Sequence, residues 1–398
     1  MSAMKRPFTR CLCVLLLLCV LFPATPVPAR AEYRALTVGD KGQDVVALKK
    51  RLYELGYFNS KSFGDTFTKD TAGKIRRFIS KYGEDGDVAT PEVQERLYAE
   101  DARPASYVPM TGPASVGPTA RPELPELAED GTLKDKSAAP FLYKNPDAGL
   151  WLYISGTLSV EIKRFDNRVD NLVWLETRVR LSGGNRIRTI FSDEQMTGKR
   201  FNKPLTIVKK HEGVILAFSD DYFGWRKDAK DVEGIVVREG RVYSNVTRTN
   251  RKFPPLDVMA ALPDGSLRTY LPDAHTAQEY LDMGVENTWA FGPILVQNGE
   301  AFRPEELDAE ACEPRQGMGM LAPNDYLFLT VLGRRQDSDG CSLQWMQNRF
   351  LGLGVREAIN LDGGNSAMLV FDGEMLNKVK NISADSVRDM VSMIAFTD

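Results

Sequence analysis

The residues from 141 to 398 contain a series of short segments rich in β-branched and aromatic residues, and this series restricts the possible folds more than any other feature. Examples are LWLYISGTLSVEIKRF, NLVWLETRVRL and DYLFLTVLGRR. Such composition favours strands, and Gly, Asp or Asn turn residues bound several of the segments. The segments REGRV and VQNGEAF predict hairpins, the second with an Asn-Gly turn. We therefore expect a mainly antiparallel sheet.

Helical periodicity is rarer in this region. The segment SLQWMQNRFLGLGV places Leu343 and Phe350 on one side and Ser342 near its start, which predicts a helix that ends at Gly352 or Gly354. The segment HTAQEYLDMG predicts one more short helix. The expected class of residues 141–398 is α+β, with a mainly antiparallel sheet and few helices.

Residues 33–100 have a different pattern. Apolar residues recur at spacings of three and four in QDVVALKKRLYEL, and Gly56 follows as a C-cap. A second such segment contains Ile75 and Phe78, with Thr71 as N-cap or first-turn residue. A third begins at Thr90-Pro91, a cap followed by proline in the first turn. These features predict a small three-helix module.

Over residues 101–140, prolines recur as far as Pro125 and polar residues follow, so apolar residues are too few to compensate the entropy of ordering. We expect an extended linker there, between the module and the large domain. At 398 residues the chain is also long enough for two domains.

The first 31 residues resemble a secretory leader. Basic residues precede the apolar run CLCVLLLLCVLF, and PARA supplies small residues at Ala29 and Ala31. We expect cleavage after Ala31 and a secreted protein, the alternative being an uncleaved anchor. Cleavage removes four basic residues and changes the net charge from −3 to −7. A mildly acidic chain of this kind is not expected to bind nucleic acid.

Two cysteines remain after cleavage, Cys312 and Cys341. An even pair in an oxidising compartment is a disulfide candidate. The alternative is two separate buried thiols.

An apolar stretch near the C-terminus is interrupted by Asp362-Gly363-Gly364. The interruption places a carboxylate at a strand end, beside backbone that can adopt positive φ. Successive amides in such a turn can form an anion-binding nest. The alternative is an ordinary tight turn in which Asp362 bonds its own backbone.

Residues 33–100 resemble the peptidoglycan-binding domains of cell-wall hydrolases. The resemblance is carried by Gly39, Gly42, Val45, Leu48, Leu52, the LGY run at 55–57, Gly64, Phe67, Thr71, Phe78 and Asp85-Gly86. A glutamine that is common in the second helix of that family is Ile79 here. The resemblance implies peptidoglycan or another wall glycopolymer as partner. The alternative is a three-helix spacer that binds nothing.

The large domain resembles the phosphodiester glycosidase family, which is also described as NAGPA-like or uncovering-enzyme-like. The run INLDGGNSAM fits its Asn-Leu-Asp-Gly-Gly element. The other segments that fit, in chain order, are AFSDDYF, FGPILVQNGE, PRQGMGM, TVLGRRQDSDGCSL and SVRDMVSMIAF. The resemblance implies hydrolysis of a sugar 1-phosphodiester, for example one of GlcNAc, to free sugar and a phosphomonoester.

The resemblance also implies roles for individual residues. Asp362 is the first choice for carboxylate chemistry and Asp221 the second. The expected phosphate contacts are Arg315 and Arg334 with the amides of Gly363 and Gly364, the expected substrate-orienting residues are Asn360, Asn365 and Ser366, and Arg388 is expected to pair with a site acid. The alternative for each arginine is a surface ion pair. We expect no metal or other cofactor. The alternative is a site that binds a divalent cation.

This sequence departs from the family pattern at Ser219-Asp220, Leu332 and Trp345. Two functions therefore remain. The first is a secreted, extracellular or wall-associated hydrolase of sugar phosphodiesters. The second is a catalytically inactive protein that binds wall polymers or polysaccharide.

Overall fold

The computed structural model describes residues 33–58, 63–82, 84–104, 117–118, 120–168, 170–193, 201–221, 234–246, 255–308, 311–335, 337–377 and 388–398. The predicted secretory leader lies outside these ranges. Within them, no helix is both long enough and apolar enough to cross a membrane.

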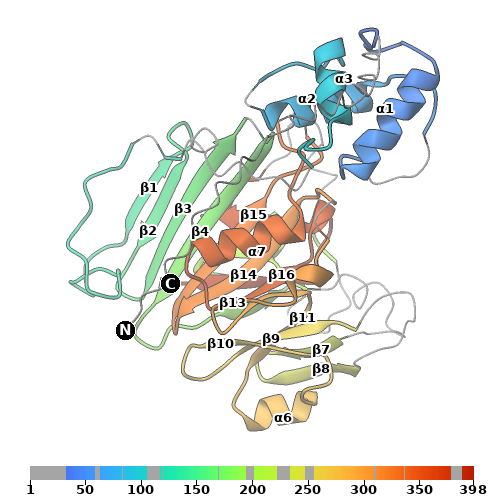
Figure 1. Cartoon of the computed structure of the whole chain (residues 1–398). Coiled ribbons are helices and arrows are strands. Elements are labelled where there is room, and N and C mark those ends of the chain that lie inside the picture. The colour runs from blue at the N-terminus through green and yellow to red at the C-terminus, as the bar shows by residue number, and fades with distance from the viewer. Residues whose placement is uncertain are drawn as a thin grey trace, which may run out of the picture.

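Three helices form the N-terminal module, which is blue in Figure 1: α1 (Gln43–Glu54), α2 (Lys69–Ser80) and α3 (Pro91–Tyr98). They enclose a separate apolar core that includes Leu48, Phe67 and Phe78. The N-cap of α2 is Thr68, whose hydroxyl accepts from the amide of Thr71, so Thr71 is a first-turn residue.

A nine-stranded sheet forms the main layer of the large domain, in the order β1-β2-β3-β4-β15-β14-β16-β12-β13, with antiparallel neighbours throughout. Its strands are β1 (Phe141–Asn145), β2 (Leu150–Ile154), β3 (Leu158–Asn167), β4 (Leu172–Leu181), β12 (Ile294–Gln297), β13 (Glu300–Ala301), β14 (Arg315–Ala322), β15 (Asp325–Val331) and β16 (Glu357–Leu361). The predicted α+β class with a mainly antiparallel sheet is confirmed.

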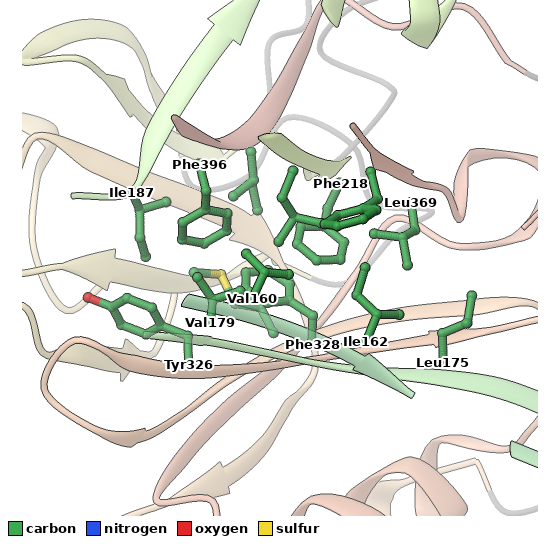
Figure 2. Packing of buried hydrophobic residues seen from close by; sticks show 14 of the residues in the cluster. Val160, Ile162, Leu175, Val179, Ile187, Phe218, Tyr326, Phe328, Leu369 and Phe396 are labelled. Carbon is green, nitrogen blue, oxygen red and sulfur yellow. The ribbon is translucent and has the colours of Figure 1, made fainter. Parts of the chain in front are cut away.

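A second, five-stranded sheet packs against the first. Its order is β18-β17-β6-β19-β5, with β5 (Arg188–Phe191), β6 (Val214–Ser219), β17 (Leu369–Phe371), β18 (Glu374–Met375) and β19 (Ser392–Thr397). Figure 2 shows the core between the two sheets, where Phe218 of β6 lies against Phe328 of β15. Their rings are stacked with centroids 4.0 Å apart.

Two smaller sheets complete the domain. One contains β9 (Asp257–Ala261), β10 (Leu267–Tyr270) and β11 (Asn287–Phe291), and the other is the hairpin of β7 (Gly234–Arg238) and β8 (Arg241–Val246). The short helix α6 (Ala277–Asp282) begins after Thr276, which caps it, and shares their core. A further short helix, α4 (Pro204–Lys209), was not predicted, because six residues are too few to show a helical period.

Helix α7 (Leu343–Gly352) covers the outer face of the nine-stranded sheet, as the orange ribbon in Figure 1 shows. Ser342 caps it by accepting from the amide of Trp345. Arg349 of α7 pairs with the buried Glu176 of β4 at 2.5 Å, and Trp174 donates to the same carboxylate at 2.7 Å. These bonds attach the helix to the sheet.

The predicted linker over 101–140 is wrong for its second half. Leu133 is buried, and its amide donates to the carbonyl of Ser155 at 2.8 Å. Asp130 accepts from Ser182 at 2.7 Å. Residues 126–134 thus belong to the domain, because a leucine and a few turn hydrogen bonds suffice to order them. Most of the Pro-rich first half lies outside the described residues.

The Asp398 carboxylate joins β19 to the nine-stranded sheet. Tyr153, Ser155 and Thr157 all donate to it, at 2.6, 2.7 and 2.6 Å. Burial by itself would raise the pKa of Asp398. The hydrogen bonds from these three hydroxyls together lower it by more, so the pKa lies below its ordinary value. A carboxyl whose pKa is depressed in the folded state stabilises the fold at pH values above its unfolded pKa of about 3.9. This stabilisation is lost as the pH falls through the folded-state pKa.

We therefore expect Asp398→Asn to be less stable than wild type at pH 7, and the difference to shrink as the pH falls from about 5 to 3. Denaturant midpoints measured at pH 7, 5 and 3 test this. A difference that stays constant over this range would show that the charge of Asp398 is not what stabilises the contact.

Candidate active site

One end of the nine-stranded sheet brings most of the predicted site residues together. At this end Arg315 of β14 pairs with Val331 of β15, and Gln316 pairs with Leu361 of β16. Because neighbouring strands are antiparallel, the segments before β14, after β15 and after β16 meet here. Arg334 and Asp362 lie on two of these segments.

Asp362 follows β16 directly and is buried, with 8% of its surface exposed. Its amide donates to the carbonyl of Asp220 at 3.2 Å, which ties it to the end of β6. The Arg388 guanidinium lies 3.7 Å from its carboxylate. A largely dehydrated carboxylate beside a cation is a typical arrangement for acid–base or nucleophilic work.

The two glycines allow close packing after Asp362. A Cβ at Gly363 would lie 2.5 Å from the carbonyl oxygen of Pro314, and Gly364 has a φ of +57°. The Gly364 amide donates to that same carbonyl at 2.8 Å. This amide is therefore not available to an anion, and the prediction that the Gly364 amide donates to a bound phosphate is wrong. The expectation for Gly363 stays a prediction.

Arg334 lies over the Asp-Gly-Gly turn and is 49% exposed along its side chain. Its Nε donates to Glu313 at 2.7 Å and its Nη1 to the Asn365 Oδ1 at 3.1 Å. The carbonyl of Asn365 accepts from the amide of Arg388 at 3.4 Å. Asn365 thus connects two arginines beside Asp362.

Arg315 contacts a loop. Its Nε donates to the carbonyl of Cys341 at 3.3 Å and its Nη2 to the carbonyl of Ala311 at 3.1 Å. Backbone carbonyls occupy these donors, so the predicted role as a phosphate clamp is replaced by a structural one.

Asp221 is fully buried against Arg238, and neither side chain is exposed (0% each). Their charged atoms are 2.6 Å apart, and the amide of Ala290 donates to the same carboxylate oxygen at 2.9 Å. The second carboxylate predicted for catalysis is therefore bound in an internal ion pair. Nothing in the sequence indicated that Arg238 pairs with Asp221, because Arg238 lies in a separate, apolar strand, GIVVR.

Three buried polar side-chain atoms near the turn have no hydrogen-bond partner among the described residues: Asn360 Oδ1, Ser366 Oγ and Ser219 Oγ. Ser219 is close to the turn because its amide donates to the carbonyl of Met368 at 3.2 Å. Buried polar atoms are nearly always paired. Two of these residues were predicted to orient substrate, and Ser219 is an addition.

The predicted disulfide is not formed, and both cysteines are free thiols. Cys341 pairs through its backbone with Glu313, the residue after Cys312. Side chains of successive extended residues point to opposite faces, which separates the two thiols. Cys341 is buried, which raises the pKa of its thiol, while Cys312 accepts a hydrogen bond from Arg77.

Asp257 was also missed by the sequence, where it only begins an apolar run. Its carboxylate accepts from the amide of Ile294 at 2.8 Å, beside Gly292, whose carbonyl accepts from Asn360. Burial raises the pKa of Asp257, and the Ile294 amide offsets this only in part. No group of three or more His, Cys, Asp or Glu side chains within the described ranges is placed to hold a metal.

Residues 212–397 match the model of the NAGPA family, described as phosphodiester glycosidase. A prophage-derived uncharacterized protein of Bacillus subtilis, YomE, is 24% identical over 192 residues, which are 48% of this chain and 29% of that protein. The chain thus spans less than a third of this curated relative.

Two solved structures are similar. The zebrafish N-acetylglucosamine-1-phosphodiester alpha-N-acetylglucosaminidase catalytic domain, auto-inhibited by its pro-peptide, has 15% identity and a TM-score of 0.47 over 61% of this chain and 84% of that one. A hypothetical protein from Synechocystis has 12% identity and a TM-score of 0.43, and the match covers 65% of this chain and 72% of that one. The match to the phosphodiester glycosidase family model, over residues 212–397, covers the part of the chain that contains Asp362, Arg334 and Arg388.

Proposed function

We propose that the chain hydrolyses a glycosyl 1-phosphodiester, releasing a free sugar and a phosphomonoester. The observation that supports this most directly is a buried carboxylate, Asp362, with one arginine 3.7 Å away and a second, Arg334, reached through Asn365. The family match of residues 212–397 supports the same reaction class.

The reaction requires a carboxylate and cations. Breaking the bond between C1 and the phosphate oxygen develops positive charge on the sugar, which Asp362 stabilises as nucleophile or as base for the attacking water. The bonding electrons leave with the phosphate oxygen. Because this phosphate is a good leaving group, it needs positive charge more than a proton. Arg334 and Arg388 supply that charge through planar forks suited to phosphate.

The oxygens of Asn360, Ser366 and Ser219 that find no hydrogen-bond partner within the described part of the chain support a polar ligand at the turn. Sugar hydroxyls can donate to all three, which would remove the cost of burying them unpaired. Sugars linked through a 1-phosphodiester, such as GlcNAc, fit this requirement.

The cellular setting is part of the same proposal. The leader-like residues 1–31 and the resemblance of residues 33–100 to wall-binding modules support secretion and attachment to peptidoglycan or another wall glycopolymer. Wall polymers with sugar-phosphate links would then be the substrates.

The test uses the full chain and the methyl diester of α-GlcNAc 1-phosphate in ¹⁸O-labelled water. Glycosidase chemistry places the label on the released sugar, because the C1–O bond breaks. Label on the phosphate would show cleavage of the P–O bond and would refute the proposal. Absence of release together with retention of wall polymers would favour the binding protein, once other sugars had been tested as diesters.

Arg334→Leu is expected to lower kcat/KM about 10- to 100-fold, since a hydrogen bond to a charged group contributes about 1.5–3 kcal/mol. Arg178→Leu is the matched control, because Arg178 is similarly exposed (42%) and also paired with a carboxylate, Asp325, at the opposite end of β15. Initial rates at several diester concentrations give the comparison. Equal losses in both variants would remove Arg334 from the site.

A further inference from the structure

The N-terminal module is docked on the large domain at the same sheet end as the candidate site. Figure 1 shows α2 near the upper ends of β3 and β4. Lys81, which follows α2, pairs with Asp170 of the turn between these strands at 2.7 Å. Their side chains are only 5% and 10% exposed. Arg77 of α2 is also buried and donates to Cys312.

These contacts are specific. A lysine and an aspartate removed from water must meet in a defined geometry, or the loss of hydration outweighs their attraction. A buried guanidinium likewise requires acceptors at fixed places. The module is therefore held in one orientation.

Residues 312–315 connect this interface to the candidate site, and we call them the bracket. Cys312 accepts from Arg77, and Glu313 accepts from the Nε of Arg334 at 2.7 Å. The Pro314 carbonyl accepts from the Gly364 amide at 2.8 Å. Arg315 binds the carbonyls of Ala311 and Cys341. Four successive residues thus bond the module, the site arginine, the Asp-Gly-Gly turn and the neighbouring loop.

We infer that the bracket couples docking of the module to the geometry of the candidate site, which makes Arg77 a positioning residue. If Arg77 is removed, Cys312 loses its contact with the module. Glu313 and Pro314 adjoin it in the chain, so Arg334 and the Gly364 amide lose fixed acceptors. Asp362 lies two residues before Gly364. The consequence for catalysis rests on the proposed function, but the structural coupling does not.

Hydrogen exchange of the full chain tests the coupling without any substrate. Arg77→Leu should accelerate exchange in a peptide covering 362–371 at least about fivefold, because the Gly364 amide becomes less protected. Arg76→Leu is the matched control, since Arg76 is on the same helix but pairs with Asp87 inside the module, at 2.9 Å. It should leave 362–371 unchanged. Lys81→Met, which loosens docking without touching Cys312, should accelerate the same peptide.

Faster exchange confined to the module in both Arg77→Leu and Lys81→Met would overturn the inference. Arg77→Lys should restore most of the protection, because a lysine can still donate to Cys312. A merely destabilised variant would instead accelerate peptides throughout both large sheets, including those of β2 and β19.

The kinetic readout is the division between KM and kcat for the methyl diester of α-GlcNAc 1-phosphate. Arg77→Leu should raise KM about five- to tenfold and change kcat less than about twofold, since Arg334 is the residue proposed to contact the phosphate and Asp362 keeps its partner Arg388. An unchanged KM together with faster exchange at 362–371 would refute the catalytic consequence. If wild type does not cleave the diester, the proposed function fails, while the exchange result still decides the coupling.

Discussion

Replacing Asp362 by asparagine is expected to lower kcat for the methyl diester of α-GlcNAc 1-phosphate at least about 100-fold. An amide of the same shape keeps the backbone bond to Asp220 but can act neither as nucleophile nor as base. The positive charge that develops at C1 would also lose its stabilising partner. Release of reducing sugar, followed at saturating diester, measures the effect.

The control is Asp372-Gly373, the next Asp-Gly pair after Asp362-Gly363 in the chain. Asp372 occupies a hairpin turn with a φ of +45°, where it pairs with Lys144. Asparagine tolerates that conformation well, so Asp372→Asn should fold normally and keep wild-type turnover. Turnover of Asp362→Asn within about threefold of wild type would exclude Asp362 from the chemistry, whatever the other site variants show.

The sheet of the large domain could be predicted because local signals agreed with the tertiary structure. The β-branched segments became β2, β3, β4 and β15, and Asn298-Gly299 joins β12 to β13 as an Asn-Gly hairpin should. The order of the strands could not be predicted. It depends on pairings such as β4 with β15, which lie about 150 residues apart in the chain and have no local signal.

The site residues could be predicted only where they lie together in one short segment of the sequence. Asp362, Gly363 and Asn365 lie in a single short motif, and the structure places Arg334 and Arg388 around it. Arg315 and Asp221 differ, because their partners lie outside any motif that the sequence shows: the carbonyls of Ala311 and Cys341 for Arg315, and Arg238 for Asp221. A sequence shows that an arginine is present, but not whether it meets a phosphate, a carbonyl or a buried acid.

Asp221 gives the sharpest contrast between a structural and a catalytic carboxylate. Arg238 also donates to the carbonyls of Val237 and Thr288, so it is held in place with or without its acid. Asp221→Asn would leave this guanidinium charged and buried without its carboxylate. Removing one member of such a pair costs about 3–5 kcal/mol, which is a large part of a typical folding free energy of about 5–15 kcal/mol.

We therefore expect Asp221→Asn to lower Tm by roughly 6–20 °C, while the fraction that stays folded at 20 °C keeps turnover within about threefold of wild type. Asp325→Asn, which breaks the more exposed pair with Arg178, should cost less than about 1 kcal/mol. Calorimetric melting and sugar release measured on the same samples separate the two roles. A variant with the wild-type Tm and a 100-fold loss of turnover would make Asp221 a catalytic residue, because a purely structural ion pair cannot be lost without a change in stability.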